Sequence, residues 1–254
     1  MRFIKMLILL IAIPTISSAK CNYRGIYFLS KCNSINKNAL IILEFYASSQ
    51  KLVKDLNIKY PIYFKSKDDK VLLNPIETFV GEMNLTQVIF KPKTLLKAGQ
   101  TYTLEIENLP YTELMPMRYN GTKNKAEPID FKVNDSIDIE NPILENSIIE
   151  TKKTIEYYGC GPEKIVHFKL NSKDKSECFA KVTVRNKSTN KITTYILRIE
   201  NQMVSVGHGM CSGAFHFDNG DNFEATFQLI DQSGNYSSVS KIIAFTKPTD
   251  ANSK

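Results

Sequence analysis

The densest group of reactive side chains in this chain lies at residues 207–213, where glycines surround His208 and Cys211, with His216 following shortly after. A histidine beside a cysteine can take the thiol proton and create a nucleophile. However, no Asn or Asp can be assigned the role of orienting such a histidine, and a glycine-rich turn also suits a structural disulfide. We therefore expect no catalytic residue here. A thiol-dependent enzyme centred on His208, Cys211 and His216 is the alternative.

A metal-dependent version of that alternative would add His167 to His208 and His216. On a fully extended strand His208 and His216 would lie about 27 Å apart, at roughly 3.4 Å per residue, although a tight turn over 209–213 would bring them together. The chain has no C-x-x-C or H-x-x-x-H spacing of the kind that zinc sites use. We expect histidines packed at strand edges, with no metal and no cofactor.

The loop 218–221 has the sequence Asp-Asn-Gly-Asp and is rich in oxygen ligands. It lacks the spaced acidic positions and the terminal Glu of a twelve-residue calcium loop. Asn-Gly is also the commonest signal for a hairpin turn. The sequence favours a turn, with calcium binding as the alternative.

Five cysteines are present, and in an oxidising compartment most of them should pair. Cys21 and Cys32 are the natural local pair. Cys160 and Cys211 both lie among glycines, where two backbones can approach closely, so we expect a second bridge between them. Cys178 begins an apolar strand and is expected to remain a buried free thiol. A Cys178–Cys211 bridge is the alternative.

The first 19 residues have the features of a secretory signal: Arg2 and Lys5, an apolar run over 6–13, then small residues at 17–19. The apolar run is too short to span a bilayer, which needs about 20 residues. A lipoprotein signal is disfavoured because Lys20, and not a small residue, precedes Cys21. We expect a cleaved signal peptide and export to the periplasm, the cell surface or the medium, with no membrane segment in the mature chain.

Charge gives little indication of a partner. The formal net charge of the full chain is +7, of which Arg2 and Lys5 contribute two and would leave with the signal. The remaining excess lies in the first half, scattered among turns such as 65–70. Such charges are typical of solvated loops, and no nucleic-acid-binding motif accompanies them, so we expect no nucleic-acid partner.

Apolar residues alternate with a period of two almost throughout, and turn residues recur about every 8–12 positions, which predicts an all-β protein built of β-sandwiches. A single helical turn is expected over 51–58. The expected strands are 40–45, 86–90, 100–106, 129–133, 164–170, 178–185, 192–200, 203–206, 223–230 and 238–245.

An acidic, polar stretch at 134–142 reads as a linker between two domains. The predicted organisation is a signal peptide at 1–19, a first domain at 20–135, a second domain at 136–247 and a disordered tail at 248–254. The segment 110–127 is rich in Pro, Met and Asn, and is predicted to be a long irregular surface loop.

In the first half, the run Phe90-Lys91-Pro92, followed by Leu95-Leu96 and by residues 97–104 (KAGQTYTL), resembles the pattern that links two late strands of the bacterial Ig-like domains of surface-layer and envelope proteins. Pro92 would end one strand, Gly99 would make the turn and Tyr102 would pack inward. The resemblance covers about 60 residues and implies an Ig-like β-sandwich. The insertion at 110–127 and the cysteine-bearing N-terminus depart from that pattern.

In the second half, residues 231–237 (DQSGNYS) resemble the turn between the last two strands of many bacterial Ig-like and fibronectin-like modules. There Asp231 would accept hydrogen bonds from the turn backbone. The resemblance implies two tandem Ig-like or fibronectin-like sandwiches and brings no catalytic residue with it, because a fold does not fix a function.

We therefore expect an exported, non-catalytic module of the cell envelope or surface that binds or scaffolds through its loops. The surface to test first is the insertion, with Tyr111, Met115, Met117 and Tyr119. The partner would be an envelope protein or a polysaccharide, and glycan binding through exposed tyrosines is a further alternative.

Overall fold

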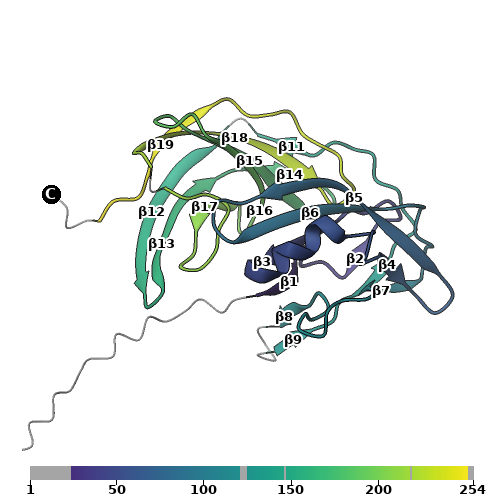
Figure 1. Cartoon of the computed structure of the whole chain (residues 1–254). Coiled ribbons are helices and arrows are strands. Elements are labelled where there is room, and N and C mark those ends of the chain that lie inside the picture. The colour runs from purple at the N-terminus through teal and green to yellow at the C-terminus, as the bar shows by residue number, and fades with distance from the viewer. Residues whose placement is uncertain (1–23, 121–124, 146, 218, 251–254) are drawn as a thin grey trace, which may run out of the picture.

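The computed structural model describes residues 24–120, 125–145, 147–217 and 219–250, and these residues are almost entirely β-structure (Figure 1). The predicted all-β class is confirmed. Within these ranges the one helical element is a 3-10 helix, η1 (Ala47–Asp55), which replaces the helical turn expected slightly later in the chain. The signal-like segment 1–19 lies outside the described residues. Within them, no helix combines the length and the apolar character needed to cross a bilayer.

The first half forms a sheet that folds over on itself. Its strands are β1 (Gly25–Phe28), β2 (Ser34–Ile35), β3 (Ile41–Tyr46), β4 (Ile62–Lys65), β5 (Lys70–Val80), β6 (Leu85–Pro92), β7 (Thr101–Ile106) and β10 (Asp130–Val133). Their order is β1-β3-β6-β5-β4-β7-β10-β2. The long strand β5 pairs with β4 before a register shift at Pro75–Glu77 and mainly with β6 after it. The bend places two layers face to face around one apolar core.

That core explains the pattern of the strands. Alternate residues of β3, including Leu43 and Phe45, point into it, as do Phe64, Tyr102 and Phe131, and all five are fully buried. Burying a large side chain stabilises the fold by about 1.5–3 kcal/mol relative to exposing it.

The second half has two larger sheets, β12-β13-β17 and β16-β15-β18-β19, and a short pair, β11-β14. The elements are β11 (Ile143–Leu144), β12 (Ile149–Tyr158), β13 (Gly161–Lys169), β14 (Ser172–Lys173), β15 (Cys178–Asn186), β16 (Ile192–Arg198), β17 (Met203–His208), β18 (Asn222–Asp231) and β19 (Ile243–Thr246). All pairings within these sheets are antiparallel.

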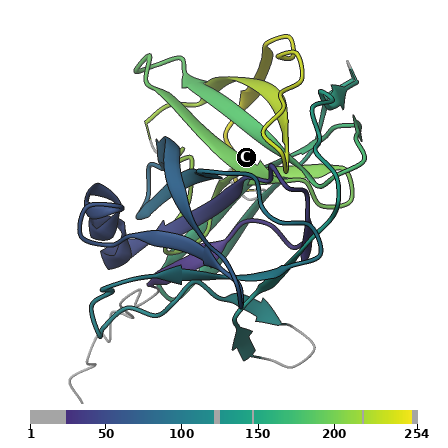
Figure 2. The same cartoon turned by 90° about the vertical axis from the view of Figure 1, so that its right-hand side faces the viewer.

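The two halves lie against each other (Figure 2), and apolar side chains fill the contact between them. Leu40 and Ile42 at β3, with Leu85 and Ile89 of β6, belong to the core of the second half, whereas their neighbours in sequence fill the core of the first. The strands β3 and β6 are therefore buried on both faces. The division into domains at 20–135 and 136–247 remains a prediction.

Gln87, at the centre of β6, ties the two halves together. It is fully buried, and its amide pairs with the backbone of Ile196 in β16: Nε2 donates to the carbonyl at 3.0 Å and Oε1 accepts from the N–H at 3.1 Å. A side chain thus takes the place of a strand partner for a buried backbone group, which would otherwise be costly to leave unpaired.

The stretch 134–142, which the sequence suggests is a linker, is held against the first half. Asn38 donates to the carbonyl of Asp138 at 2.6 Å and accepts from its N–H at 3.2 Å, and Ser136 donates to Asn36. In the predicted tail, Asp250 accepts a hydrogen bond from Tyr157 at 2.7 Å, and 251–254 lie outside the described residues.

The residues that carry the family resemblance behave as expected. Pro92 is the last residue of β6, Gly99 turns with φ +76°, and Tyr102 is buried with its hydroxyl donating to Asp69 at 2.6 Å. In the second half, the Asp231 carboxylate accepts from the N–H groups of Ser233 and Asn235, both at 2.8 Å.

The prediction for 110–127 was partly wrong. This segment contains a short hairpin, β8 (Arg118–Asn120) and β9 (Lys125–Glu127), and is not irregular throughout. The long edge strand β12 was also missed. Its burial pattern shows no alternating apolar face, so the period-two signal is absent there.

Candidate binding pocket

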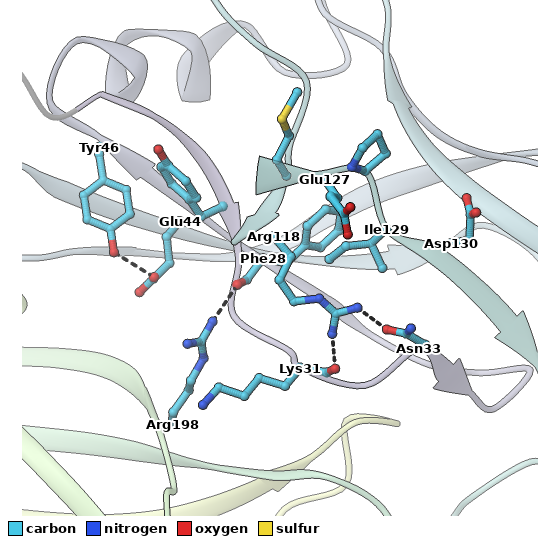
Figure 3. A pocket seen from close by; sticks show the side chains of 13 residues that line it. Phe28, Lys31, Asn33, Glu44, Tyr46, Arg118, Glu127, Ile129, Asp130 and Arg198 are labelled. Carbon is cyan, nitrogen blue, oxygen red and sulfur yellow. Dashed lines mark hydrogen bonds between the residues drawn. The ribbon is translucent and has the colours of Figure 1, made fainter. Parts of the chain in front are cut away.

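A pocket of about 850 Å³ opens where β1, β3, the β8–β9 hairpin and the end of β16 meet (Figure 3). It therefore combines side chains from both halves and from the insertion. The lining residues are Tyr27, Phe28, Lys31, Asn33, Glu44, Tyr46, Met117, Arg118, Glu127, Pro128, Ile129, Asp130 and Arg198.

The pocket exists because β1 is the edge strand of its sheet. One side of β1 pairs with β3, and among the described residues the other side meets a single backbone bridge, from Tyr27 to Met117. Alternation along the strand sends Ile26 and Phe28 into the core and turns Tyr27 outward. The insertion thus meets β1 at one backbone bridge, and side chains fasten it elsewhere: Met115 Sδ accepts from the Ile106 N–H of β7 at 3.4 Å, and Glu113 accepts from the Ser49 hydroxyl at 2.7 Å.

Two arginines hold the chain that follows β1. Arg198, from the second half, donates through Nη2 to the carbonyl of Phe28 at 2.9 Å and through Nε to that of Leu29. Arg118, from the hairpin, donates to the Lys31 carbonyl and to the Asn33 side chain. Figure 3 shows both guanidinium groups approaching this segment from different elements. Because each guanidinium is planar with several donors, these bonds fix its orientation.

Glu44 places a carboxylate on the pocket wall. It accepts hydrogen bonds from the hydroxyls of Tyr46 at 3.0 Å and Tyr195 at 3.3 Å, and from the Gln87 amide at 3.5 Å. Burial raises the pKa of this carboxyl above its usual value, opposed by the bond from Tyr46 and by the charge of Arg198. Glu44 thus links the pocket to the interface between the halves.

The lining mixes hydrogen-bond donors, acceptors and aromatic surface. Arg118 and Lys31 supply positive charge and Glu127 and Asp130 supply negative charge, so the pocket carries no strong field of one sign. The Tyr27 and Tyr46 rings meet edge to face with centroids 5.4 Å apart. Such a lining can recognise a polar molecule through hydrogen bonds and through contact with aromatic faces.

A second hollow of about 410 Å³ adjoins the first, and it contains three of the four residues predicted for binding. Tyr111, Met115 and Met117 line it together with the outward face of β1, and Met117 lines both hollows. Tyr111 is 98% exposed. The fourth residue, Tyr119, is in β8, and its side chain lies outside the described structure. A ligand-binding role for these residues remains a prediction.

The polar wall of the pocket, formed by Glu44, Arg118 and Arg198, was not predicted from the sequence. Arg118 and Arg198 lie far apart in the chain, and only the packing of the two halves brings them to the same strand. Glu44 could have been recognised as a candidate, because it interrupts an apolar run that predicts a buried strand. A charged residue at such a place requires polar partners.

The histidine and cysteine group at 207–213 and His216 is brought together by the turn. The rings of His208 and His216 lie 4.7 Å apart, centroid to centroid. Cys211 is disulfide-bonded, so it has no thiolate with which to attack a substrate. His167 lies elsewhere on β13, with its ring nitrogens 3.1 Å from Ser205 Oγ and 3.4 Å from Thr154 Oγ1.

The cysteine pairing differs from the prediction. No two of the four described cysteines are bridged to each other. Cys32 is a free thiol, which corrects the expected Cys21–Cys32 bridge, and the expected Cys160–Cys211 bridge is likewise not formed. Cys178 is a free thiol as expected, although it is only partly buried.

Cys32 and Cys178 both ionise less readily than an ordinary cysteine, because their pKa values are raised. Burial, followed by the charge of Glu177, raises the pKa of Cys32 to about 11. Burial and a set of nearby carboxylates raise that of Cys178 to about 12.

Of the possible calcium loop 218–221, Asp218 lies outside the described residues. The Asp221 carboxylate forms an ion pair with Lys247 at 2.7 Å. The carbonyl of Asn219 accepts a hydrogen bond from the Asn186 side chain.

No protein-family model matches the chain, and no curated protein sequence matches it. A crystal structure of type I pullulanase from Bacillus subtilis with maltose aligns at 9% identity and a TM-score of 0.24, covering 89% of this chain and 25% of that chain. The chain thus spans about a quarter of that pullulanase.

Two multidomain fragments align similarly. Domains FN1–FN3 of chicken CNTN1 give 9% identity and a TM-score of 0.26, covering 89% of this chain and 68% of theirs. The tandem Ig repeats of Dlar give 8% identity and a TM-score of 0.23, covering 86% and 96%. TM-scores this low do not establish a shared fold, so the all-β class rests on the strands of this protein alone.

Proposed function

We propose that this chain is an exported, non-catalytic binding module of the cell envelope or surface, and that its ligand binds in the pocket beside β1. The observation that carries the proposal is the construction of the pocket. Elements from both halves and from the insertion converge on one edge strand, and two arginines hold the following segment in place. Such pre-organised polar groups lower the ordering cost of binding.

The adjoining hollow extends the pocket with apolar surface. Tyr111 and Leu114 are exposed, and Met115 is partly so, on a segment that leaves the sheet. Exposed aromatic and methionine side chains at the ends of strands are common in recognition surfaces, because they bury a large area on contact. The ligand would thus reach across both hollows, with Met117 between them.

A polysaccharide is the first ligand to test, with an envelope protein as the second. Sugars present hydroxyl groups and flat apolar faces, and the pocket offers charged hydrogen-bonding side chains beside Tyr27 and Tyr46. Sedimentation of the purified protein with insoluble peptidoglycan and with cell-wall polysaccharides, followed by an overlay on separated envelope proteins, distinguishes the two.

The matched variants are Tyr111→Ser and Tyr157→Ser. Both tyrosines are well exposed, but Tyr157 lies on β12 and lines neither hollow. We expect Tyr111→Ser to lower retention by about tenfold, consistent with the loss of one aromatic contact at a binding surface. Tyr157→Ser should bind as the unchanged protein does. Equal retention of both variants would count against the proposed site.

A further inference from the structure

Three aspartate carboxylates meet at the junction between the two halves. One oxygen from each of Asp138, Asp174 and Asp231 lies within 4.8 Å of the others. They come from separate segments: the stretch after β10, the loop between β14 and β15, and the end of β18. Within the described part of the chain, no other group of His, Cys, Asp or Glu side chains gathers closely enough to hold an ion.

Among the described residues, no Lys or Arg forms a direct ion pair with any of these carboxylates. Lys175 pairs with Glu140 at 2.9 Å, which raises its pKa, and the more distant charges of Asp138 and Asp174 add to that rise. Asp231 is fully buried, and burial raises its pKa, with Asp138 adding to the effect. Three negative charges at this range repel one another unless a cation lies between them.

Turns in the backbone fix where the carboxylates point. Oδ1 of Asp138 accepts from the N–H of Glu140 at 3.1 Å, and Oδ1 of Asp174 accepts from the N–H of Ser176 at 2.6 Å and from its hydroxyl at 2.8 Å. In Asp138 and Asp174 these bonds use Oδ1 alone, so Oδ2 is available to a ligand. In Asp231, Oδ1 accepts from the N–H groups of its turn, and Oδ2 accepts from the Asn235 side chain at 2.7 Å. The oxygens are positioned before any ion arrives.

Gln232 provides an independent sign that a ligand belongs at this place. Its side chain is 95% buried, yet its amide Nε2 has no hydrogen-bond partner among the described residues. It follows Asp231 in the chain and lines a hollow of about 540 Å³ whose wall also contains Asp138, Lys175 and Ser176. A buried amide without a partner costs free energy, and half a turn about its last bond would present Oε1 to the same space.

We propose that Asp138, Asp174 and Asp231 bind a calcium ion, with the Gln232 amide or water completing its coordination. Calcium takes six to eight oxygen ligands at about 2.3–2.6 Å, so ligand atoms up to roughly 5 Å apart fit one ion. Magnesium requires near-ideal octahedral geometry at about 2.0–2.1 Å and keeps several waters, which suits a set of three fixed carboxylates less well.

A calcium ion bound to these three aspartates would hold the two halves together. Asp138 is bonded to Asn38 of the first half, whereas Asp174 and Asp231 belong to the second. The site is separate from the pocket beside β1 and does not depend on the proposed function. It also differs from the loop 218–221, whose Asp221 pairs with Lys247.

The test is thermal unfolding of the purified full chain after treatment with chelator, with calcium chloride or magnesium chloride then added to about 10 mM. At about 100 times the dissociation constant, calcium should raise the Tm by roughly 5–10 °C, and magnesium should give a much smaller rise. Isothermal titration with calcium should show one binding site.

Asp174→Asn is the decisive variant, because Asp231 also holds its turn and its replacement could unfold the protein. Asp174→Asn should abolish the calcium-dependent rise and raise the Tm of the calcium-free protein by relieving repulsion. Asp221→Asn, an exposed aspartate elsewhere, is the control and should keep the rise. No rise with calcium in the unchanged protein, or an equal rise in Asp174→Asn, would overturn the proposal.

Discussion

The pocket beside β1 and the turn at 207–213 are two places where reactive side chains converge, and they differ in how the backbone surrounds them. In the turn, chains touch directly: a Cβ on Gly213 would lie 2.2 Å from Cβ of His208, and one on Gly207 would lie 2.0 Å from the Lys164 carbonyl. Beside β1, the insertion meets the edge strand at one backbone bridge and leaves a pocket of about 850 Å³. Reactive residues that are close in sequence can thus form a tightly packed turn with no room for a ligand. A binding site, in contrast, can be assembled from residues that are far apart in the chain.

The largest effect expected from this comparison is on stability at the turn. Gly213→Ala should destabilise the fold by about 3 kcal/mol or more, because the added methyl group meets backbone and Cβ atoms that cannot move aside. Urea unfolding measures the change.

Gly99→Ala is the control for that variant, since Gly99 has φ +76° but no heavy atom within 4 Å of the added Cβ. It should cost only about 1 kcal/mol, from the backbone conformation alone. A Gly213→Ala protein as stable as Gly99→Ala would show that the turn is not closely packed.

A smaller effect is expected at the polar wall of the pocket. The folded protein raises the pKa of Glu44 above its usual 4.5, so its contribution to stability is complete below that pH and is lost as the pH rises through the folded value. Glu44→Gln cannot ionise. The unfolding free energy of the unchanged protein relative to Glu44→Gln should therefore fall between pH 4.5 and pH 7.

Asp231 also has a raised pKa, but it is present in both proteins and cancels in that comparison. A difference between the two proteins that is constant with pH would show that Glu44 ionises as freely in the folded state as in the unfolded chain.

The cysteines should differ in reactivity without a change in stability. The raised pKa values of Cys32, about 11, and Cys178, about 12, leave little thiolate at pH 8. Peptide mapping by mass spectrometry should find both slow to alkylate in the native protein and rapidly alkylated in denaturant. Cys211 should appear only in a disulfide-linked peptide. Rapid native alkylation of Cys211 would restore the thiol enzyme as an alternative.

Much of the fold was predictable from local signals. Strands such as β3, β6 and β7 have alternating or continuous apolar residues between turn residues. The segment from Pro92 to Tyr102 also correctly predicted a turn at Gly99 and a buried tyrosine. The strand β12 was not predictable in this way, because its residues are partly or fully exposed and show no apolar face.

The binding pocket was predictable only in part. The insertion was identified from its composition, and Tyr111, Met115 and Met117 do line a hollow. Arg198 could not be foreseen, because its position depends on packing between distant strands. The three aspartates at the junction were missed for the same reason: they lie in three segments that only the folded chain brings together.

The measurement that tests the central claim most directly is binding by two arginine variants, Arg118→Ala and Arg185→Ala. Arg118 lines the pocket and holds the segment after β1. Arg185 is exposed, lines neither hollow, and donates to Asn190 in the turn between β15 and β16. Each protein is sedimented with peptidoglycan and polysaccharides and overlaid on envelope proteins, after circular dichroism shows that it is folded.

We predict that Arg118→Ala retains its fold but loses at least about tenfold in affinity for the ligand that the unchanged protein binds, because one arginine anchor contributes roughly 1–2 kcal/mol or more at a binding site. Arg185→Ala should bind normally. Equal binding by both folded variants would contradict the assignment of the pocket beside β1 as the binding site.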